Sequence, residues 1–228
     1  MITLNNISKF YKDTLVINNF SNIFNTNTTT ALLGKNGAGK STLIKLITCQ
    51  LYPDQGQIFF NELNTFEKNI DIKIQIGYVS ENPFFYENWT VRNYLNYCGQ
   101  IQNVKAERID YIIELLSLIN ICNKKINTLS KGLRQRLAFA QSILHDPNYL
   151  ILDEPFSSLD PLQKQEIYSI LENFKGNKTI IFSTHQISDI KNICDKVLIL
   201  DKGKIIYNGN YSNEITKYFN EKNDNQEN

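Results

Sequence analysis

The segment from residue 34 to residue 41 reads Gly34-Lys35-Asn36-Gly37-Ala38-Gly39-Lys40-Ser41, which matches the pattern G-x-x-x-x-G-K-[ST]. The apolar run at 28–33 predicts a strand, and residues 40–51 are apolar around most of a helical circumference, which predicts a packed helix ended by Pro53 and Gly56. The glycines leave backbone N–H groups open to phosphate oxygens, because a side chain there would block them. Strand, loop and helix together predict a phosphate-binding loop, in which Lys40 supplies a charge to the β- and γ-phosphates and Ser41 a hydroxyl to Mg²⁺.

Outward from this loop, short apolar strands alternate with amphipathic helices, which predicts an α/β domain with a largely parallel sheet. Further strands are expected at 57–60, 74–79, 149–153 and 179–183. The runs that start at Tyr149 and Thr179 are continuously apolar, which is typical of central strands. Near the end of the chain, two short runs flank Asp201-Lys202-Gly203 and predict a hairpin over 197–207.

The strand pattern disappears between Pro83 and Pro147, where helical periodicity replaces it. Apolar residues repeat there at helical spacing, at Ile109, Ile112, Ile113, Leu116 and Ile119. A second helix is predicted over 133–144, and another follows Pro161 until Gly176-Asn177 stops it. We therefore expect a single domain over 1–228, with a catalytic core at 1–82 and 147–210, an inserted helical subdomain at 83–146, and a C-terminal helix and frayed tail at 211–228.

Composition excludes several classes of function. The 228 residues carry 24 Lys and Arg against 23 Asp and Glu, a net charge of +1, and no long basic run offers a local surface for a polyanion. The longest apolar runs are strand-length, far below the roughly 20 residues that span a bilayer. The start of the chain lacks the basic and apolar regions of a signal peptide, so we expect a cytosolic protein. Four scattered cysteines without a C-x-x-C pair are expected to be reduced and half-buried: Cys49, Cys98, Cys122 and Cys194.

An acidic pair stands at the end of a predicted central strand, in Tyr149-Leu150-Ile151-Leu152-Asp153-Glu154-Pro155. Consecutive strand residues point to opposite faces, so we expect the two carboxylates to have different roles. Asp153 is predicted to hold Mg²⁺, directly or through water, and Glu154 to polarise the attacking water as a general base. Either acid alone is also typical of a strand end that caps the next helix, but both together beside a phosphate-binding loop favour catalysis.

These motifs resemble the ATP-binding-cassette (ABC) ATPases, and specifically the nucleotide-binding subunits of ABC transporters, over about residues 2–209. The most specific element is Leu129-Ser130-Lys131-Gly132-Leu133-Arg134-Gln135-Arg136, which is similar to the LSGGQ signature of that family. Ser130 and Gly132 precede a predicted helix whose N-terminus attracts phosphate, although Ser130 alone is also typical of a plain N-cap. The resemblance implies that this end contacts the γ-phosphate of ATP held by the opposite subunit of a head-to-tail dimer. It also implies the P-loop NTPase fold of ABC ATPases, a RecA-like mixed sheet with an N-terminal antiparallel part.

Further motifs follow in the order that the family has. Ser158-Leu159-Asp160-Pro161 resembles the D-loop, which runs along the dimer interface, and Thr184-His185 resembles the switch histidine that contacts the γ-phosphate and orients the attacking water. Tyr11 matches the aromatic that stacks on adenine, and it is also typical of an edge strand. The resemblance assigns nucleotide contacts to the whole phosphate-binding loop and to Thr42. His145 matches no motif and is expected to be structural.

Glu81, in Gly77-Tyr78-Val79-Ser80-Glu81-Asn82-Pro83, stands where the family usually has a glutamine that touches Mg²⁺ and relays the nucleotide state to the membrane subunit. A glutamate still offers an oxygen to the metal, with an added negative charge. Aromatic residues follow at Phe84, Phe85, Tyr86 and Trp89. They are expected either to face the groove that receives a coupling helix of the membrane protein or to belong to the core of the helical subdomain.

The resemblance implies an ATP hydrolase that binds MgATP, pairs with a second ABC subunit, either a copy or a paralogue, and drives a separate transmembrane permease from the inner face of the cell membrane. The signature and the C-terminal stretch look most like exporters of the ABC-2 type, such as those for drugs, bacteriocin immunity or sodium. No nucleic-acid partner is expected. The alternative is a soluble ABC protein that acts on ribosomes or DNA, although such proteins usually carry two cassettes or a long coiled-coil insertion. A module that binds ATP without turnover is disfavoured by Glu154 and His185.

Overall fold

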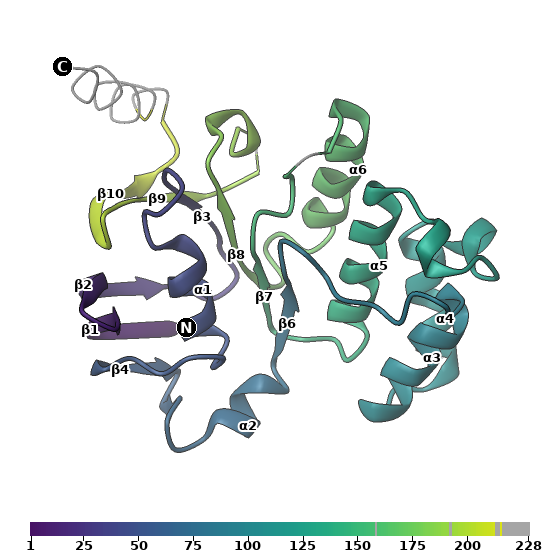
Figure 1. Ribbon diagram of the computed structural model, residues 1–228, viewed down its shortest axis with the longest axis horizontal. Coiled ribbons are helices and arrows are strands. Elements are labelled where there is room, and N and C mark those ends of the chain that lie inside the picture. Colours follow the sequence, from purple (N-terminus) through teal and green to yellow (C-terminus); the bar gives the residue numbers. More distant parts are fainter. Residues whose placement is uncertain (158, 192, 213–214, 216–228) are drawn as a thin grey trace.

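The computed structural model describes residues 1–157, 159–191, 193–212 and 215. A small antiparallel sheet lies at one end, a mixed sheet in the middle and a group of helices at the other end (Figure 1). The strands are β1 (Ile2–Tyr11), β2 (Thr14–Phe24), β3 (Thr29–Leu33), β4 (Gln55–Phe60), β5 (Leu63–Asn64), β6 (Ile76–Val79), β7 (Tyr149–Leu152), β8 (Thr179–Thr184), β9 (Lys196–Asp201) and β10 (Lys204–Asn210). The helices are α1 (Lys40–Ile47), α2 (Asn69–Lys73), α3 (Val91–Ile101), α4 (Ala106–Leu115), α5 (Lys131–Ile143) and α6 (Pro161–Glu172), with short 3₁₀ turns at Ile119–Ile121, Ile126–Thr128 and Ile187–Asp189.

The mixed sheet has the order β10-β9-β3-β8-β7-β6, and its strands pair in parallel except for the antiparallel β9–β10 hairpin. The smaller sheet, β2-β1-β4-β5, is antiparallel throughout. The predicted α/β fold, with a mixed sheet and an N-terminal antiparallel part, is therefore confirmed, as is the predicted hairpin near the end of the chain.

Register brings the carboxyl ends of the parallel strands to one edge of the mixed sheet. Leu33, the last residue of β3, pairs with Thr184, the last residue of β8. Leu152 at the end of β7 pairs with Val79 at the end of β6. The phosphate-binding loop, the acidic pair, the switch histidine and Glu81 all follow these strand ends, at the edge where open parallel sheets bind ligands.

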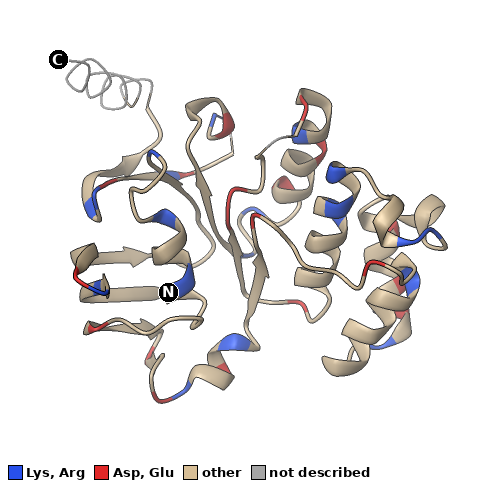
Figure 2. Cartoon of the chain, viewed as in Figure 1, with Lys and Arg blue, Asp and Glu red and all other residues tan. Residues whose placement is uncertain are grey.

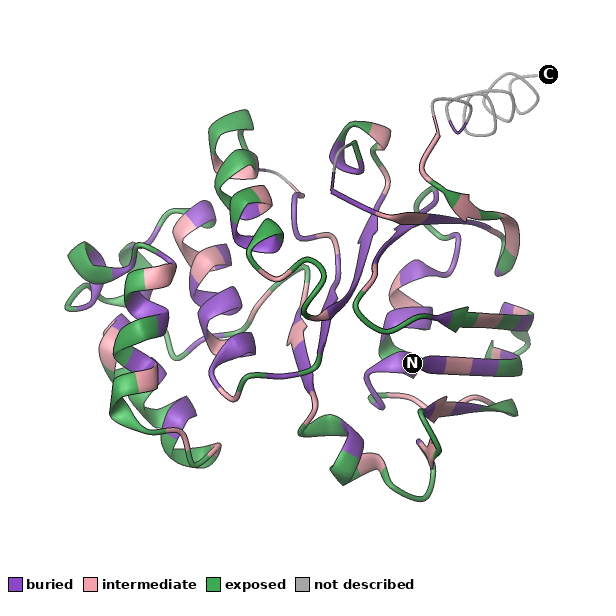
Figure 3. Cartoon of the chain, turned by 180° about the vertical axis from the view of Figure 1, so that it is seen from behind, coloured by how far each residue is buried: buried purple, intermediate pink, exposed green. Residues whose placement is uncertain are grey.

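Both faces of the mixed sheet are covered, which explains why its strands are apolar without alternation. In β3, Ala31 and Leu33 face a core shared with α3–α6, whereas Leu32 faces a second core shared with α1 and the antiparallel sheet. The central strands β3, β7 and β8 are correspondingly buried along their length, whereas the edge strand β10 is partly exposed (Figure 3). Each fully buried Leu, Ile or Phe side chain contributes about 1.5–3 kcal/mol of transfer free energy. This burial stabilises the central strands, whose carboxyl ends carry the candidate site residues.

Several helix boundaries differ from the prediction, and α6 ends at Glu172 rather than at Gly176-Asn177. α1 ends at Ile47 rather than near residue 51, because Cys49 adopts a left-handed φ of 54° and the N–H groups of Gln50 and Leu51 turn back to the carbonyl of Lys45. α5 begins at Lys131 rather than at residue 133, because the Ser130 hydroxyl accepts from the Leu133 N–H and caps the helix there. The periodicity pattern had also missed α3, which Thr90 caps through the Asn93 N–H.

The cysteines and the charged residues are distributed much as the composition predicts. All four cysteines are free and buried, more deeply than the half-burial expected, and burial raises the pKa of the Cys49 thiol to about 11. Acidic and basic residues are interspersed over sheets and helices alike (Figure 2). None of the helices that the structure describes has the length and apolarity required to span a bilayer. The helix and frayed tail predicted over 211–228 lie outside the described residues, apart from 211, 212 and 215.

Candidate nucleotide site

The phosphate-binding loop joins β3 to α1 through glycines in the left-handed region. Gly37 has a φ of +80° and Gly39 a φ of +106°. A Cβ atom at Gly39 would lie 3.1 Å from the backbone oxygen of Val16, so conformation and space both require glycine there. Gly39 is the N-cap of α1 and has no side chain to bind the first N–H groups of the helix, and the first turn contains no acidic residue. The positive end of α1 is therefore available to a phosphate.

Lys40 lies beneath this loop, with only 5% of its surface exposed. Its Nζ donates to the carbonyl oxygens of Gly34 at 2.7 Å and Lys35 at 3.3 Å, and it lies 3.3 Å from Glu154 Oε1. A buried ammonium requires such compensation, and a bound phosphate would offer the same kind of acceptor.

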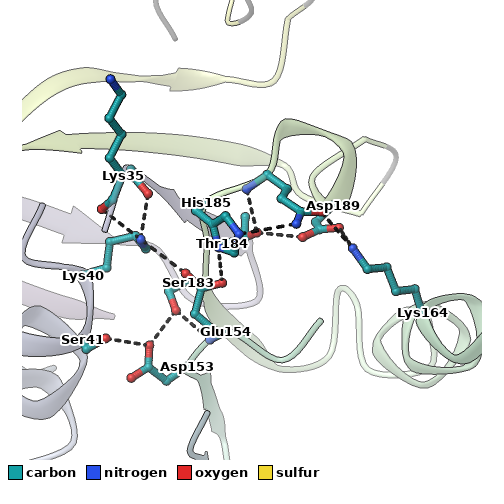
Figure 4. Close-up of polar contacts among 12 residues, drawn as sticks. Lys35, Lys40, Ser41, Asp153, Glu154, Lys164, Ser183, Thr184, His185 and Asp189 are labelled. Atoms are coloured by element: carbon teal, nitrogen blue, oxygen red, sulfur yellow. Dashed lines mark hydrogen bonds and ion pairs between the residues drawn. The ribbon is translucent and has the colours of Figure 1, made fainter. Parts of the chain in front are cut away.

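Asp153 is 5% exposed and receives two hydroxyl donors on one oxygen. Ser41 Oγ, from α1, donates to Asp153 Oδ1 at 3.2 Å, and Ser183 Oγ, from β8, donates to the same oxygen at 2.7 Å (Figure 4). These contacts bring together two residues that lie 112 positions apart in the chain. The sequence prediction had missed Ser183, and its one available signal was a hydroxyl directly before Thr184-His185.

Glu154 and His185 form the second half of the site. His185 Nδ1 lies 3.0 Å from Glu154 Oε2, and the two residues follow the adjacent strands β7 and β8 (Figure 4). Glu154, a candidate catalytic residue, has a left-handed backbone conformation with a φ of 48°. Its N–H donates to Ser183 Oγ at 2.8 Å. The carboxylate therefore lies between a lysine ammonium on one side and an imidazole on the other.

These side chains surround one cavity of about 330 Å³. Its lining combines the phosphate-binding loop with the strand ends: Val16, Lys35, Asn36, Gly37, Gly39, Lys40, Ser41, Thr42, Glu81, Glu154, Ser157 and His185. Val16 and Ser157 are further residues that the sequence prediction did not include. Asp153 does not line the cavity itself but contacts Ser41, which does. Among the described residues, the other predicted site residues that do not line it are Tyr11, Gly34, Ala38, Ser130, Gly132 and Asp160.

The signature and D-loop residues lie together elsewhere, at the starts of two neighbouring helices. Ser130 caps α5, and Asp160 caps α6 in a reciprocal arrangement with Gln163. A Cβ atom at Gly132 would lie 2.7 Å from the Gln163 side chain, so glycine allows α5 and α6 to approach closely at this end. Ser158 of the D-loop lies outside the described residues. Tyr11 ends β1 and is 44% exposed.

The donor set at Ser41 and Asp153 fits a hard divalent cation. A carboxylate and a hydroxyl are oxygen ligands of the kind that Mg²⁺ prefers, and Glu81 lines the same cavity. The part of the chain that the structure describes contains no group of three His, Cys, Asp or Glu side chains placed to enclose a metal.

The aromatic residues after Glu81 differ in their exposure. Phe85 is 1% exposed and packs edge-on against Tyr94, with the Arg134 guanidinium 5.1 Å from its ring centre. Phe84 is 86% exposed, whereas Tyr86 and Trp89 are partly exposed and stack on each other. One residue of the four is therefore core, and three contribute to a surface.

Comparisons with known proteins agree with this geometry. Residues 17–157 match the family model described as "ABC transporter". The chain is 34% identical over 213 residues to the uncharacterized ABC transporter ATP-binding protein YxlF of Bacillus subtilis, covering 92% of this chain and 70% of that protein. It is 30% identical over 219 residues to the ABC transporter ATP-binding protein NatA of the same organism, covering 92% of this chain and 89% of that one.

Solved structures have the same fold. The structure of an ATP-binding subunit of an ABC transporter superposes with a TM-score of 0.85 at 25% identity, covering 96% of this chain and 93% of that chain. A dimeric bacterial ABC transporter cassette superposes with a TM-score of 0.83 at 22% identity, covering 92% of this chain and 98% of that chain, which shows the shared fold. The chain therefore belongs to the ABC transporter family, as one of its ATP-binding and ATP-hydrolysing subunits.

Proposed function

We propose that this subunit hydrolyses MgATP to power export of a substrate through a separate membrane permease, from the inner face of the cell membrane. One observation carries the catalytic part of the proposal: Lys40, Glu154 and His185 converge on the cavity formed by the phosphate-binding loop. The export direction and the separate permease rest on the resemblance of the signature and the C-terminal stretch to ABC-2-type exporters.

Each polar group in the cavity has a distinct role in this proposal. Lys40 exchanges its contacts with carbonyl oxygens and Glu154 for the β- and γ-phosphate oxygens. Ser41, Asp153 and Glu81 are the residues that would hold Mg²⁺, which supplies positive charge against the charge that develops on the transferred phosphoryl group. Glu154 accepts the proton of the attacking water at its carboxylate, and the imidazole of His185 holds that carboxylate in place.

The start of α5 supplies the remaining half of a composite site. Ser130 and Gly132 lie off the cavity, and the first turn of α5 contains Lys131 and no acidic residue, so this helix end favours an anion. We propose that it contacts the γ-phosphate of ATP bound to a second cassette, with Asp160 at the interface and Tyr11 against the adenine. Two cassettes in head-to-tail contact would then complete two sites.

The exposed aromatic residues form the proposed contact with the permease. Tyr86, Trp89 and Tyr97 pack against one another, and Trp89 and Tyr97 line a hollow of about 430 Å³ together with Asn93. An exposed aromatic group of this kind fits the apolar face of a short helix. Its first member, Tyr86, follows Glu81 by five positions in the chain, and Glu81 lines the nucleotide cavity.

Glu154→Gln tests the catalytic assignment. The variant keeps the shape and removes the base, so we expect the ATPase rate to fall by at least about 100-fold, because a general base contributes roughly 10²–10⁴-fold. Binding of a fluorescent ATP analogue should be retained, and gel filtration with ATP should show a persistent dimer. Glu62→Gln, at an exposed acid outside the cavity, is the matched control and should keep the wild-type rate. An unchanged rate in Glu154→Gln would contradict the mechanism.

A further inference from the structure

We infer that Ser183 is a positioning residue of the ATPase site, whose buried hydroxyl fixes the side chain of Asp153 and the backbone of Glu154 relative to each other. The inference rests on the catalytic role proposed above for Glu154. Ser183 does not line the cavity; it acts through the two acidic residues that it contacts.

The hydrogen bonds at Ser183 have a fixed direction. Its Oγ lies 2.7 Å from Asp153 Oδ1 and 2.8 Å from the Glu154 backbone nitrogen, and the residue is 0% exposed. The backbone N–H only donates, so the serine oxygen accepts there, and its single proton goes to the carboxylate. A serine hydroxyl has one donor and acceptor lone pairs, and both capacities are used.

Glu154 needs such a contact because its backbone is in an unfavourable conformation. A φ of 48° is left-handed, which a residue with a Cβ atom adopts only when its surroundings hold it. On one side the Glu154 N–H is held by Ser183, and on the other its carbonyl accepts from the Ser157 N–H at 3.1 Å. Without the serine oxygen, the buried N–H loses its partner and the backbone is free to leave the left-handed region, which moves the carboxylate.

The end of β8 therefore holds Glu154 at two separate points. Ser183 binds its backbone nitrogen, and His185, two residues further along the chain, contacts its carboxylate at Oε2. Ser183 is in β8 and His185 directly follows it, so both contacts come from the carboxyl end of this strand, which pairs with β7 in the sheet. Through Asp153 Oδ1, the same serine is connected to Ser41 at the start of α1.

Ser142 provides a comparison with an ordinary buried serine. It is 4% exposed, and its Oγ donates to the Phe139 carbonyl three residues earlier in α5, a local contact within one helix. Ser183 instead bonds across to Asp153 and Glu154, the two residues that follow β7. Ser142→Ala and Ser183→Ala remove the same atom from equally buried positions, so they separate a loss of stability from a loss of positioning.

The test compares Ser183→Ala with Ser142→Ala in the full chain. We expect kcat of Ser183→Ala to fall about 10- to 100-fold, the scale that follows from misplacing a reacting group by about 1 Å, with the KM for ATP unchanged. Hydrogen exchange at the Glu154 amide, measured without metal or nucleotide, should become faster in Ser183→Ala and stay as in wild type in Ser142→Ala. Ser183→Cys, which is a weaker hydrogen-bonding group of similar shape, should give an intermediate kcat.

Wild-type kcat and wild-type Glu154 amide exchange in Ser183→Ala would overturn the inference, as would wild-type kcat in Ser183→Cys if the alanine variant does not fold. An equal loss of kcat in Ser142→Ala would also overturn it, because a general loosening of the core would then explain the effect. Glu154→Gln distinguishes this failure from a failure of the proposed function. If that variant is inactive while Ser183→Ala is active, only the positioning role is wrong.

Discussion

Glu154 combines a left-handed backbone conformation with the catalytic role proposed above. Its side chain is 10% exposed, and its carboxylate lies between Lys40 and His185. A carboxylate in such a setting is costly to bury without polar partners, so Lys40 and His185 are part of what holds it in place. Strained conformations persist when the surroundings hold them in place. Here Lys40 of α1 contacts the Glu154 side chain, and Ser183 and His185 at the end of β8 contact its backbone and its carboxylate.

His145 shows a different use of burial, away from the nucleotide cavity. Its Nε2 lies 3.2 Å from the Ile76 carbonyl oxygen, and its Nδ1 is buried with no hydrogen-bond partner among the described residues. Burial, and secondarily Lys178, lowers the pKa of this imidazole below its usual range, although the Ile76 carbonyl and Asp146 act in the opposite direction. The sequence prediction of a structural histidine agrees with this environment.

The lowered pKa of His145 predicts a loss of stability in acid. Between the folded pKa and the unfolded value of about 6.5, the unfolded chain binds the proton and the folded chain does not, so the free energy of unfolding decreases as the pH falls. In urea denaturation at pH 7.5 and pH 5.5, wild type should lose more stability than His145→Gln, which lacks this titrating group. Equal pH dependence in the two proteins would show that His145 does not contribute.

At the scale of elements, an ion pair between Lys164 and Asp189 connects α6 to the 3₁₀ turn that follows β8. Lys164, one turn after the Asp160 cap, donates to Asp189 Oδ1 at 2.7 Å and to Gln186 Oε1 at 3.0 Å (Figure 4). Asp189 also accepts from the Thr184 hydroxyl at 2.8 Å. The helix that starts at the D-loop is therefore connected to both sides of His185.

Lys164→Ala should lower the free energy of unfolding substantially. Asp189 is only 3% exposed, and removal of its partner leaves a buried charge unpaired, which costs about 3 kcal/mol. Lys175→Ala is the matched control, since Lys175 pairs with Asp195 at 3.1 Å with both side chains more than a third exposed, and it should cost less than about 1 kcal/mol. Urea denaturation of the two variants measures the difference. Similar losses would contradict the buried-pair explanation.

Element boundaries show where local sequence patterns stop being informative. The central strands β3, β7 and β8 were predictable because both of their faces are buried, which favours a continuous apolar run. The end of α1 was not, because Cys49 takes a left-handed φ of 54° without the glycine that usually marks such a position. The start of α5 was shifted by two residues because the cap chemistry of Ser130, and not the first apolar residue, sets where the helix begins.

At the scale of the whole molecule, the predicted site residues separate into two groups. The phosphate-binding loop, Glu81, Glu154 and His185 lie around one cavity, whereas Ser130, Gly132 and Asp160 lie at the starts of α5 and α6. The second group is not within the cavity of its own chain. This arrangement supports the proposal that a second cassette contributes them.

Mixing two inactive variants tests this arrangement. Glu154→Gln removes the base from its own site, and Ser130→Phe blocks the site to which α5 contributes, so each variant alone should be inactive. In a mixed head-to-tail dimer one site keeps both parts. An equimolar mixture should therefore recover about one quarter of the wild-type ATPase rate, since about half of the dimers are mixed and each has one intact site. No recovery would contradict pairing between copies of this chain.

The amino-acid sequence by itself determined the α/β class, the phosphate-binding loop and the acidic strand end, because each depends on residues that are neighbours in the chain. Only the tertiary structure decided that Ser183 contacts both Asp153 and Glu154, that Phe85 is core while Phe84 is exposed, and that Lys164 pairs with Asp189. For Ser183 the physical reason is strand register. Parallel pairing of β7 with β8 brings residues about 30 positions apart within hydrogen-bonding distance, and no local pattern specifies which of their side chains will meet.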